Sequence, residues 1–165
     1  MNFKNIIKLT AKDMKEVNHK IIKQLHSKVN LINQISNYII SGGKQIRPIL
    51  VILIVYALKY NNMKHHITIA AIIKFTHNVT LLHDDIIDKL TLRRGKTTVN
   101  VVFGNAVSIL IGDFIYTCLF KIITTINLLK VLKSISYVIN NIVEGEIMQL
   151  INKKILIFLQ KNICV

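Results

Sequence analysis

The chain has almost no residues that make tight turns, with one proline and six glycines in 165 residues. β-Sandwiches and β-barrels need turn residues at short, regular intervals, so this scarcity favours a fold made of long helices. Hydrophobic residues make up 52% of the sequence, which argues against intrinsic disorder. We therefore predict one all-α domain that covers residues 1–165 and is large enough to bury a core.

Apolar residues recur at helical spacing along most of the chain. The segments that follow this period are 3–30, 31–41, 48–60, 68–90, 101–124 and 128–150. Gly42 and Gly43, the polar run 61–66 and the stretch around Gly95 separate them. Pro48 suits the first turn of the third segment, where no backbone N–H is needed. The pattern predicts a helical bundle with short connections.

The net charge of +14 raises the question of an anionic partner. Nucleic-acid-binding proteins usually gather their basic residues on one face, whereas the lysines here are scattered along the chain. A preference for Ile, Lys and Asn is also what an AT-rich coding sequence produces. We therefore interpret most of the charge as solvated surface and expect no nucleic-acid partner.

Two features indicate a cytoplasmic protein. Cys118 and Cys164 form neither a disulfide framework nor a metal-binding spacing. The first 20 residues mix Lys, Asn and Asp with short apolar groups, so no signal peptide is expected. The most apolar windows, 48–60 and 106–120, are shorter than the roughly 20 residues that span a bilayer.

Three of the eight acidic residues lie within five positions, at Asp84, Asp85 and Asp88. At about 100° per residue, His77, Asp84 and Asp88 fall on one helical stripe roughly 40° wide, while Asp85 points about 100° away from Asp84. Apolar residues occupy the opposite face as a predicted core: Ile72, Phe75, Val79, Leu82, Ile86 and Leu90.

Carboxylates one turn apart repel each other, and aspartate is a poor helix former in mid-helix. A cation would offset that cost, and carboxylate oxygens suit Mg²⁺, which takes one or two carboxylates plus substrate phosphates. Spacing alone leaves a solvated acidic surface as an equal alternative. The three arginines shift the balance, because Arg47, Arg93 and Arg94 all lie near this cluster or its neighbouring loops, and arginine binds phosphate in a bidentate manner. The pattern is that of a diphosphate site.

Five segments carry a resemblance to a known family. They are "GGKQIRP" at 42–48, "HNVTLLHDDIID" at 77–88, "RRGKTTVN" at 93–100, "FGNAVSILIGDF" at 103–114 and "VEGEIMQL" at 143–150. In order and spacing the chain resembles the N-terminal half of the trans-polyprenyl diphosphate synthases, of the long-chain, octaprenyl diphosphate synthase type. The resemblance implies an isoprenoid-synthase-type helical bundle, truncated relative to the family.

The resemblance also implies roles for individual residues. Asp84 and Asp88 match the Mg²⁺-binding acids of the first aspartate-rich motif and, with Arg93, form the catalytic set. Arg93 matches the residue that holds the allylic diphosphate. Lys44, Arg47, His77 and Arg94 match the residues that bind isopentenyl diphosphate, although His77 considered alone could be a core histidine.

The implied reaction is a prenyl transfer of isoprenoid biosynthesis, the Mg²⁺-dependent condensation of isopentenyl diphosphate with an allylic diphosphate. Short-chain members carry aromatic residues four and five positions before the first aspartate, where this chain has Thr80 and Val79. We therefore expect a medium- or long-chain trans-polyprenyl diphosphate, a precursor of quinone side chains. The family further implies a homodimer and a peripheral membrane contact through the product.

The sequence departs from the family pattern after residue 150. The second aspartate-rich motif of the family and its preceding Lys-Thr pair are missing, and we expect 151–165 to be a non-homologous tail. The alternative hypothesis is therefore an inactive remnant or a non-catalytic subunit that lacks the second motif. A third hypothesis is a basic helical protein that binds RNA or membrane, which the acids beside Arg93 and Arg94 make less favourable.

Overall fold

The computed structural model describes residues 3–40, 43–59, 65–126 and 129–163, and for 126 and 154–163 it describes the backbone alone. The chain divides after residue 126 into two compact units. We describe each unit by itself. The single domain over 1–165 and the separate tail from 151 stay predictions.

Helices form nearly all of the first unit, so the predicted all-α class is confirmed. The helices are α1 (Phe3–Leu25), α2 (Asn30–Ile40), α3 (Ile46–Ala57), α4 (His65–Ile87), α5 (Val99–Phe103) and α6 (Asn105–Ile126). Two short strands, β1 (Leu92–Arg93) and β2 (Lys96–Thr97), stand between α4 and α5. Pro48 lies in the first turn of α3, as predicted.

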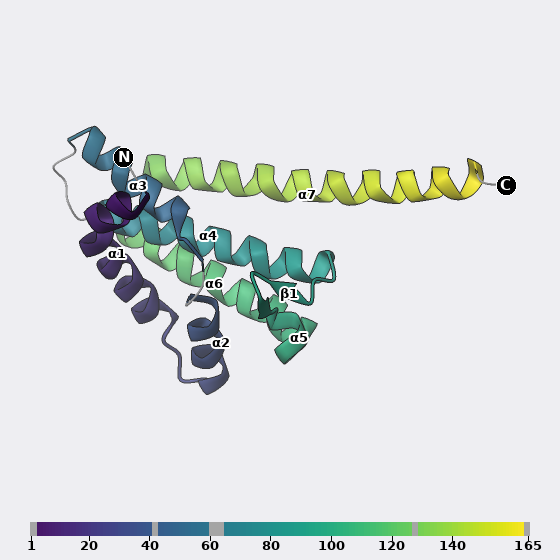
Figure 1. Ribbon diagram of the computed structural model, residues 1–165, viewed down its shortest axis with the longest axis horizontal. Coiled ribbons are helices and arrows are strands. Elements are labelled where there is room, and N and C mark those ends of the chain that lie inside the picture. Colours follow the sequence, from purple (N-terminus) through teal and green to yellow (C-terminus); the bar gives the residue numbers. More distant parts are fainter. Residues whose placement is uncertain (1–2, 41–42, 60–64, 127–128, 164–165) are drawn as a thin grey trace. The chain divides into compact units, whose positions relative to one another are not determined.

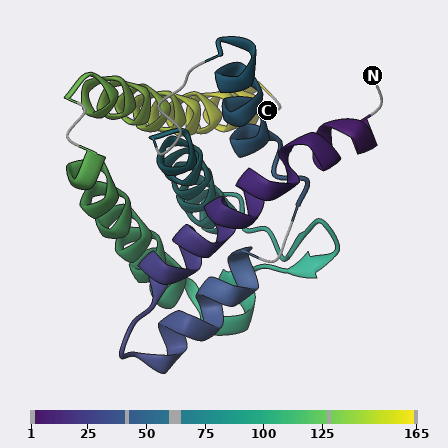
Figure 2. The same cartoon turned by 90° about the vertical axis from the view of Figure 1, so that its left-hand side faces the viewer.

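The central helix of this unit is α4, which packs against α1, α3, α5 and α6. Figure 1 shows α4 and α6 side by side, and Figure 2 shows α1 crossing α4. The predicted core face of α4 is buried over its first four members, and Ile86 and Leu90 are half-buried. The largest fully buried side chains are Phe75, Ile21, Ile35, Ile52, Ile72, Ile115, Leu119 and Ile122.

The stretch around Gly95 is a β-hairpin instead of the plain connection that the sequence suggested. β1 and β2 are antiparallel, with Leu92 opposite Thr97 and Arg93 opposite Lys96. The two loop residues have positive φ angles, 55° at Arg94 and 76° at Gly95. Two central residues with positive φ are the mark of a type I′ turn, which fits the twist of a hairpin.

Several helix boundaries differ from the predicted ones. Gly104, with φ of 90°, ends α5, so the predicted helix 101–124 is two helices. The polar run 61–66 is not all loop, because α4 begins at His65. Residues 61–64, Gly42 and Cys164 lie outside the described residues.

A polar network that is buried at Asp13 and His66 and exposed at Tyr56 joins three of the helices. Tyr56 of α3 donates a hydrogen bond to Asp13 of α1 (Oη to Oδ2, 2.6 Å), and His66 Nε2 of α4 lies 3.2 Å from the same oxygen. The bond to Asp13, together with burial, raises the pKa of Tyr56 to about 12. This network holds α1 and α3 against the beginning of α4.

Helix α6 is longer than the apolar window that predicted it. By length and composition alone it could cross a bilayer, a property that it shares with the core helices of many proteins. One face of α6 is core, including Ile111, Ile115 and Leu119, and Cys118 on that face is buried. The described residues contain one such helix.

The second unit is the single helix α7 (Leu129–Ile163). It continues thirteen residues beyond the predicted end at Leu150, without a break at 151. Asn140 donates a hydrogen bond to Glu144 one turn later, 2.6 Å from Nδ2 to Oε1.

Candidate functional site

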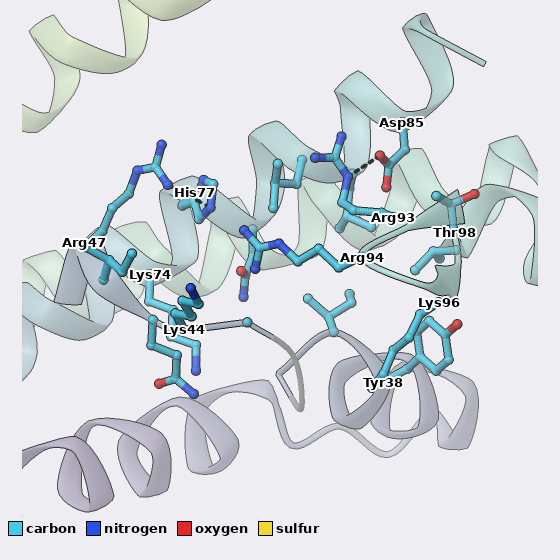
Figure 3. A pocket seen from close by; sticks show the side chains of 18 of the residues that line it. Tyr38, Lys44, Arg47, Lys74, His77, Asp85, Arg93, Arg94, Lys96 and Thr98 are labelled. Carbon is cyan, nitrogen blue, oxygen red and sulfur yellow. Dashed lines mark hydrogen bonds and ion pairs between the residues drawn. The ribbon is translucent and has the colours of Figure 1, made fainter. Parts of the chain in front are cut away.

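A pocket of about 340 Å³ lies where α2, α3, α4 and the hairpin meet. Figure 3 shows the side chains that line it. Tyr38 and Ile39 come from α2, and residues 43–48 bring the turn before α3 and its first residues. Helix α4 presents one face, from Lys74 through His77 to Asp85, and residues 93–99 close the opposite side.

The pocket is strongly basic. All three arginines of the chain line it, together with three lysines, so the basic residues are Arg47, Arg93, Arg94, Lys44, Lys74 and Lys96. Asp85 is the single carboxylate among the lining residues. The predicted set for isopentenyl diphosphate, Lys44, Arg47, His77 and Arg94, is thus gathered in one pocket, as Figure 3 shows.

Arg47 and His77 are in direct contact, with 2.9 Å between Nη1 and Nε2. A guanidinium can only donate, so Nε2 accepts the bond and its ring is neutral. The pKa of His77 agrees, because burial and the charges of Arg47, Arg94 and Arg93 lower it to about 4. His77 therefore orients Arg47, and at neutral pH it adds no charge of its own to the pocket.

Two loops with unusual backbone geometry bring the basic groups together. Gln45 before α3 and Arg94 in the hairpin have φ of 50° and 55°, a region that costs non-glycine residues roughly 1–3 kcal/mol each. A Cβ atom on Gly43 would lie 1.9 Å from Arg94 Nη1. Glycine leaves room for the guanidinium there, whereas a side chain would displace it, so residues far apart in sequence meet over the pocket.

Arg93 is paired with Asp85, with 2.5 Å between Nε and Oδ1. Asp85 is buried while Arg93 stays partly exposed, so the carboxylate anchors the guanidinium at the edge of the pocket. The helical period predicted that the Asp85 side chain points away from Asp84. The ion pair with Arg93 gives Asp85 a partner in that direction. The role of Arg93 toward an allylic diphosphate stays a prediction.

Asp84 and Asp88 are not among the residues that line the pocket, although Asp85, next to Asp84 in the sequence, is one of them. Asp84 is half-buried in the last turns of α4, and Asp88 is exposed just beyond its end. Burial raises the pKa of Asp84, and the carboxylates of Asp88 and Asp85 add to that effect against the opposing charge of Arg93. Neither residue takes part in the ion pairs of the described chain.

The donor set suits a hard cation only when a ligand supplies further oxygens. Among the described residues, no group of three or more His, Cys, Asp or Glu side chains could hold a metal ion by itself. Mg²⁺ typically takes one or two carboxylates and completes its shell with water and phosphate oxygens. The unpaired carboxylates of Asp84 and Asp88 fit that requirement.

The hairpin wall of the pocket is fixed by polar contacts. Tyr38 donates a hydrogen bond to the carbonyl of Thr97 (2.5 Å), and Lys96 Nζ lies 5.9 Å from the centre of the Tyr38 ring. Thr98 is buried and donates to the carbonyl of Leu90 (2.7 Å). These contacts hold the segment of Arg93 and Arg94 against α2 and the end of α4.

Sequence reasoning missed Lys74, a pocket residue that is 5% exposed. A signal was available, because Lys74 is the one charged residue of the apolar stretch 67–76 and lies three positions before His77. Spacings of three and four place side chains on the same helical face.

Comparison with known proteins relates these features to a family. Residues 29–160 match the family model described as polyprenyl synthetase. The chain is 52% identical over 153 residues to the octaprenyl diphosphate synthase of Escherichia coli (strain K12), covering 92% of this chain and 47% of that protein. It is 42% identical over 153 residues to the octaprenyl diphosphate synthase of Haemophilus influenzae, covering 92% and 46%.

The fold gives the same relationship. A crystal structure of polyprenyl synthase from Caulobacter crescentus CB15, complexed with calcium and isoprenyl diphosphate, superposes with a TM-score of 0.85 at 33% identity. The match covers 90% of this chain and 45% of that one. The predicted isoprenoid-synthase type of bundle is confirmed, and the chain spans about half the length of the curated relatives it matches.

Proposed function

Because this chain belongs to the polyprenyl synthetase family, we propose that it acts in the Mg²⁺-dependent condensation of isopentenyl diphosphate with an allylic diphosphate. The observation that carries the proposal is the basic pocket, in which Lys44, Arg47 and Arg94 surround a space of about 340 Å³. Guanidinium groups bind phosphate oxygens in a bidentate manner. A compact dianion or trianion is the ligand that such a pocket suits.

The proposed steps assign separate tasks to the two diphosphates. Lys44, Arg47 and Arg94 hold the diphosphate of isopentenyl diphosphate, and the neutral His77 keeps Arg47 in position by accepting its hydrogen bond. Arg93, anchored by Asp85, faces the allylic diphosphate at the pocket edge. When bound, Mg²⁺ supplies positive charge that neutralises the leaving diphosphate, and Asp84 with Asp88 would hold it.

In the proposed reaction, the bond between the allylic carbon and the diphosphate oxygen breaks, and the electron pair leaves with the diphosphate. The double bond of isopentenyl diphosphate attacks the allylic carbon, and loss of a proton restores a double bond. Positively charged groups that are already in position when the reaction starts favour this step, because they stabilise the negative charge that develops on the leaving diphosphate.

We also propose a medium- or long-chain product. Val79 is fully buried and faces the core, and the hydroxyl of Thr80 donates to the carbonyl of His77 at 3.0 Å. Neither side chain is an aromatic plug beside the acids. A homodimer, a cytoplasmic location and a peripheral membrane contact through the product remain part of the proposal.

The test is an elongation assay with the full chain. Purified protein is incubated with isopentenyl diphosphate, an allylic diphosphate and Mg²⁺, and the prenyl products are separated by chromatography. We expect elongated product that disappears in Asp84→Ala and persists in Glu16→Ala, which removes an exposed carboxylate of α1 far from the pocket in sequence. Isothermal titration with inorganic pyrophosphate measures binding in the same samples.

Two outcomes would contradict the proposal at different levels. A folded chain that binds pyrophosphate but makes no product would exclude catalysis by this chain alone, in favour of the non-catalytic alternative. A folded chain that does not bind pyrophosphate would exclude the pocket as a diphosphate site.

A further inference from the structure

Lys74 is a buried cation for which the described residues provide no anionic partner. The residue is 5% exposed, and its Nζ donates a hydrogen bond of 2.9 Å to Asn18 Oδ1 of α1. The ion pairs of the described chain are Asp13 with His66 and Asp85 with Arg93, and neither involves Lys74. Burying an unpaired charge is costly, so this lysine requires an explanation.

The surroundings of Lys74 make that cost greater. It lines the pocket together with Lys44, Arg47 and Arg94, and Figure 3 draws it on the same side of the pocket as Lys44 and Arg47. Like charges disfavour one another when no anion lies between them. Asn18 is a neutral partner and uses one of the three N–H groups that a lysine ammonium offers.

We propose that Lys74 is a further diphosphate-holding residue of this pocket, whose ammonium is compensated when the anion is bound. The inference rests on the proposed function, which it deepens by adding a buried cationic group to the predicted set of Lys44, Arg47, His77 and Arg94. Lys74 lies one helical turn before His77 on the same face of α4. The bound diphosphate completes the ion pair that the described protein residues do not supply.

The protonation of Lys74 supports this role. Burial lowers its pKa to about 8, and a bound anion would raise that pKa again. Binding of an anion then favours the protonated form, so affinity falls as the pH rises through about 8. The charged and titratable groups that share the pocket with Lys74 are Lys44, Arg47, His77, Asp85, Arg93, Arg94 and Lys96. Helix α1 adds two polar side chains: Asn18, which does not titrate, and Lys20, which donates a hydrogen bond to Thr68.

Lys74→Met tests the proposal, because methionine keeps an unbranched side chain, one heavy atom shorter than lysine, and removes the charge. By isothermal titration with inorganic pyrophosphate at pH 7, we expect the Kd to rise about tenfold or more, the value of one charge-assisted hydrogen bond. The melting temperature without ligand should stay the same or rise, since an unpaired buried charge is removed. The decrease in affinity above pH 8 should become smaller than in the parent chain.

Two control variants separate this role from others. Lys12→Met removes an exposed lysine of α1 and should change the Kd by no more than about twofold, because exposed charges are screened. Asn18→Ala removes the neutral partner and keeps the ammonium, so pyrophosphate affinity should again stay within about twofold. A lower melting temperature with unchanged affinity in Lys74→Met would show a packing role and overturn the inference.

Arg47→Met distinguishes failure of this inference from failure of the proposed function. If Arg47→Met loses pyrophosphate binding while Lys74→Met does not, the pocket binds diphosphate and Lys74 has no part in it. If the parent chain does not bind pyrophosphate, or if Arg47→Met binds it as tightly as the parent chain does, the pocket is not the diphosphate site. The proposed function then fails, and this inference fails with it.

Discussion

The neighbours of His77 determine the charge state and the hydrogen bonding of its imidazole ring. Its ring contacts Arg47 through Nε2, and burial with three nearby arginines lowers its pKa to about 4. A neutral ring in this place positions a cation without repelling it. The family resemblance counted His77 among the ligands of a diphosphate, and the geometry gives it an orienting task through Arg47.

The low pKa of His77 has a consequence for stability at acid pH. Because the unfolded chain binds a proton at about 6.5 and the folded chain at about 4, the unfolded state binds more protons between these values. Stability therefore falls as the pH is lowered from about 6.5 to 4. In His77→Gln, which keeps an acceptor for Arg47, we expect this loss to be smaller.

Urea unfolding of the parent chain and of His77→Gln at pH 7.5, 6.0 and 4.5 measures the difference. Other titratable groups, such as Asp84, are the same in both proteins, so their contributions cancel in the comparison. If the two proteins lost the same stability between pH 7.5 and 4.5, His77 would not be held neutral by its surroundings.

At the scale of single residues, the sequence predicted most of the pocket residues, but it did not predict which side chains they contact. The helical period placed His77, Asp84 and Asp88 on one stripe, and it turned Asp85 to another side. The partners of Asp85 and His77 are Arg93 and Arg47, which lie on other elements. Periodicity within one helix carries no information on such contacts. It did carry information on Lys74, which lies three positions before His77 on the same helical face.

At the scale of elements, long segments with a clear period were predicted and short ones were not. The strands of the hairpin have two residues each, too few for an alternating pattern to be visible. Type I′ turns usually carry Asn-Gly or Asp-Gly, and here arginine takes the first position, at Arg94. That arginine is a pocket residue, so the requirement of the site outweighs the local preference.

The packing of α4 against α6 depends on one glycine. A Cβ atom on Gly112 of α6 would lie 2.4 Å from Nε2 of His83 on α4, and the His83 ring also lies near Tyr116, with 6.3 Å between ring centres. The His83 Nε2 atom is buried without a hydrogen bond in the described chain. The ring is therefore held between two residues of α6 and has little room to move.

Gly112→Ala should consequently destabilise the protein. Overpacking costs roughly 1–3 kcal/mol, and alanine in a helix recovers about 0.5–1 kcal/mol, so we expect a net loss of about 1 kcal/mol in urea unfolding. In a His83→Ala background the clash is absent, and Gly112→Ala should become neutral or stabilising. Equal effects in both backgrounds would show that His83 does not limit the approach of α4 and α6.

At the scale of the whole molecule, the question is where the excess of positive charge acts. Six of the 22 basic residues line one pocket with one carboxylate among them, while the rest are spread along the chain. The sequence indicated solvated lysines and a separate arginine-rich site, and the gathering of all three arginines in the pocket agrees with it. The match to about half the length of its relatives confirms the truncation that the missing second aspartate-rich motif had indicated.

The remaining alternative, a basic protein that binds RNA, makes a different prediction about salt. A nucleic-acid footprint of six to ten phosphate contacts loses about 10³–10⁵ in affinity between 50 and 200 mM salt. A small anion in a partly buried pocket is screened less, so we expect the Kd for pyrophosphate to change by less than about tenfold over that range. Isothermal titration with pyrophosphate, and fluorescence anisotropy with a labelled single-stranded RNA, provide the two salt series. RNA binding that is steeply salt-dependent, independent of Mg²⁺ and unaffected by pyrophosphate would favour the alternative, because an anion-specific pocket cannot produce that combination.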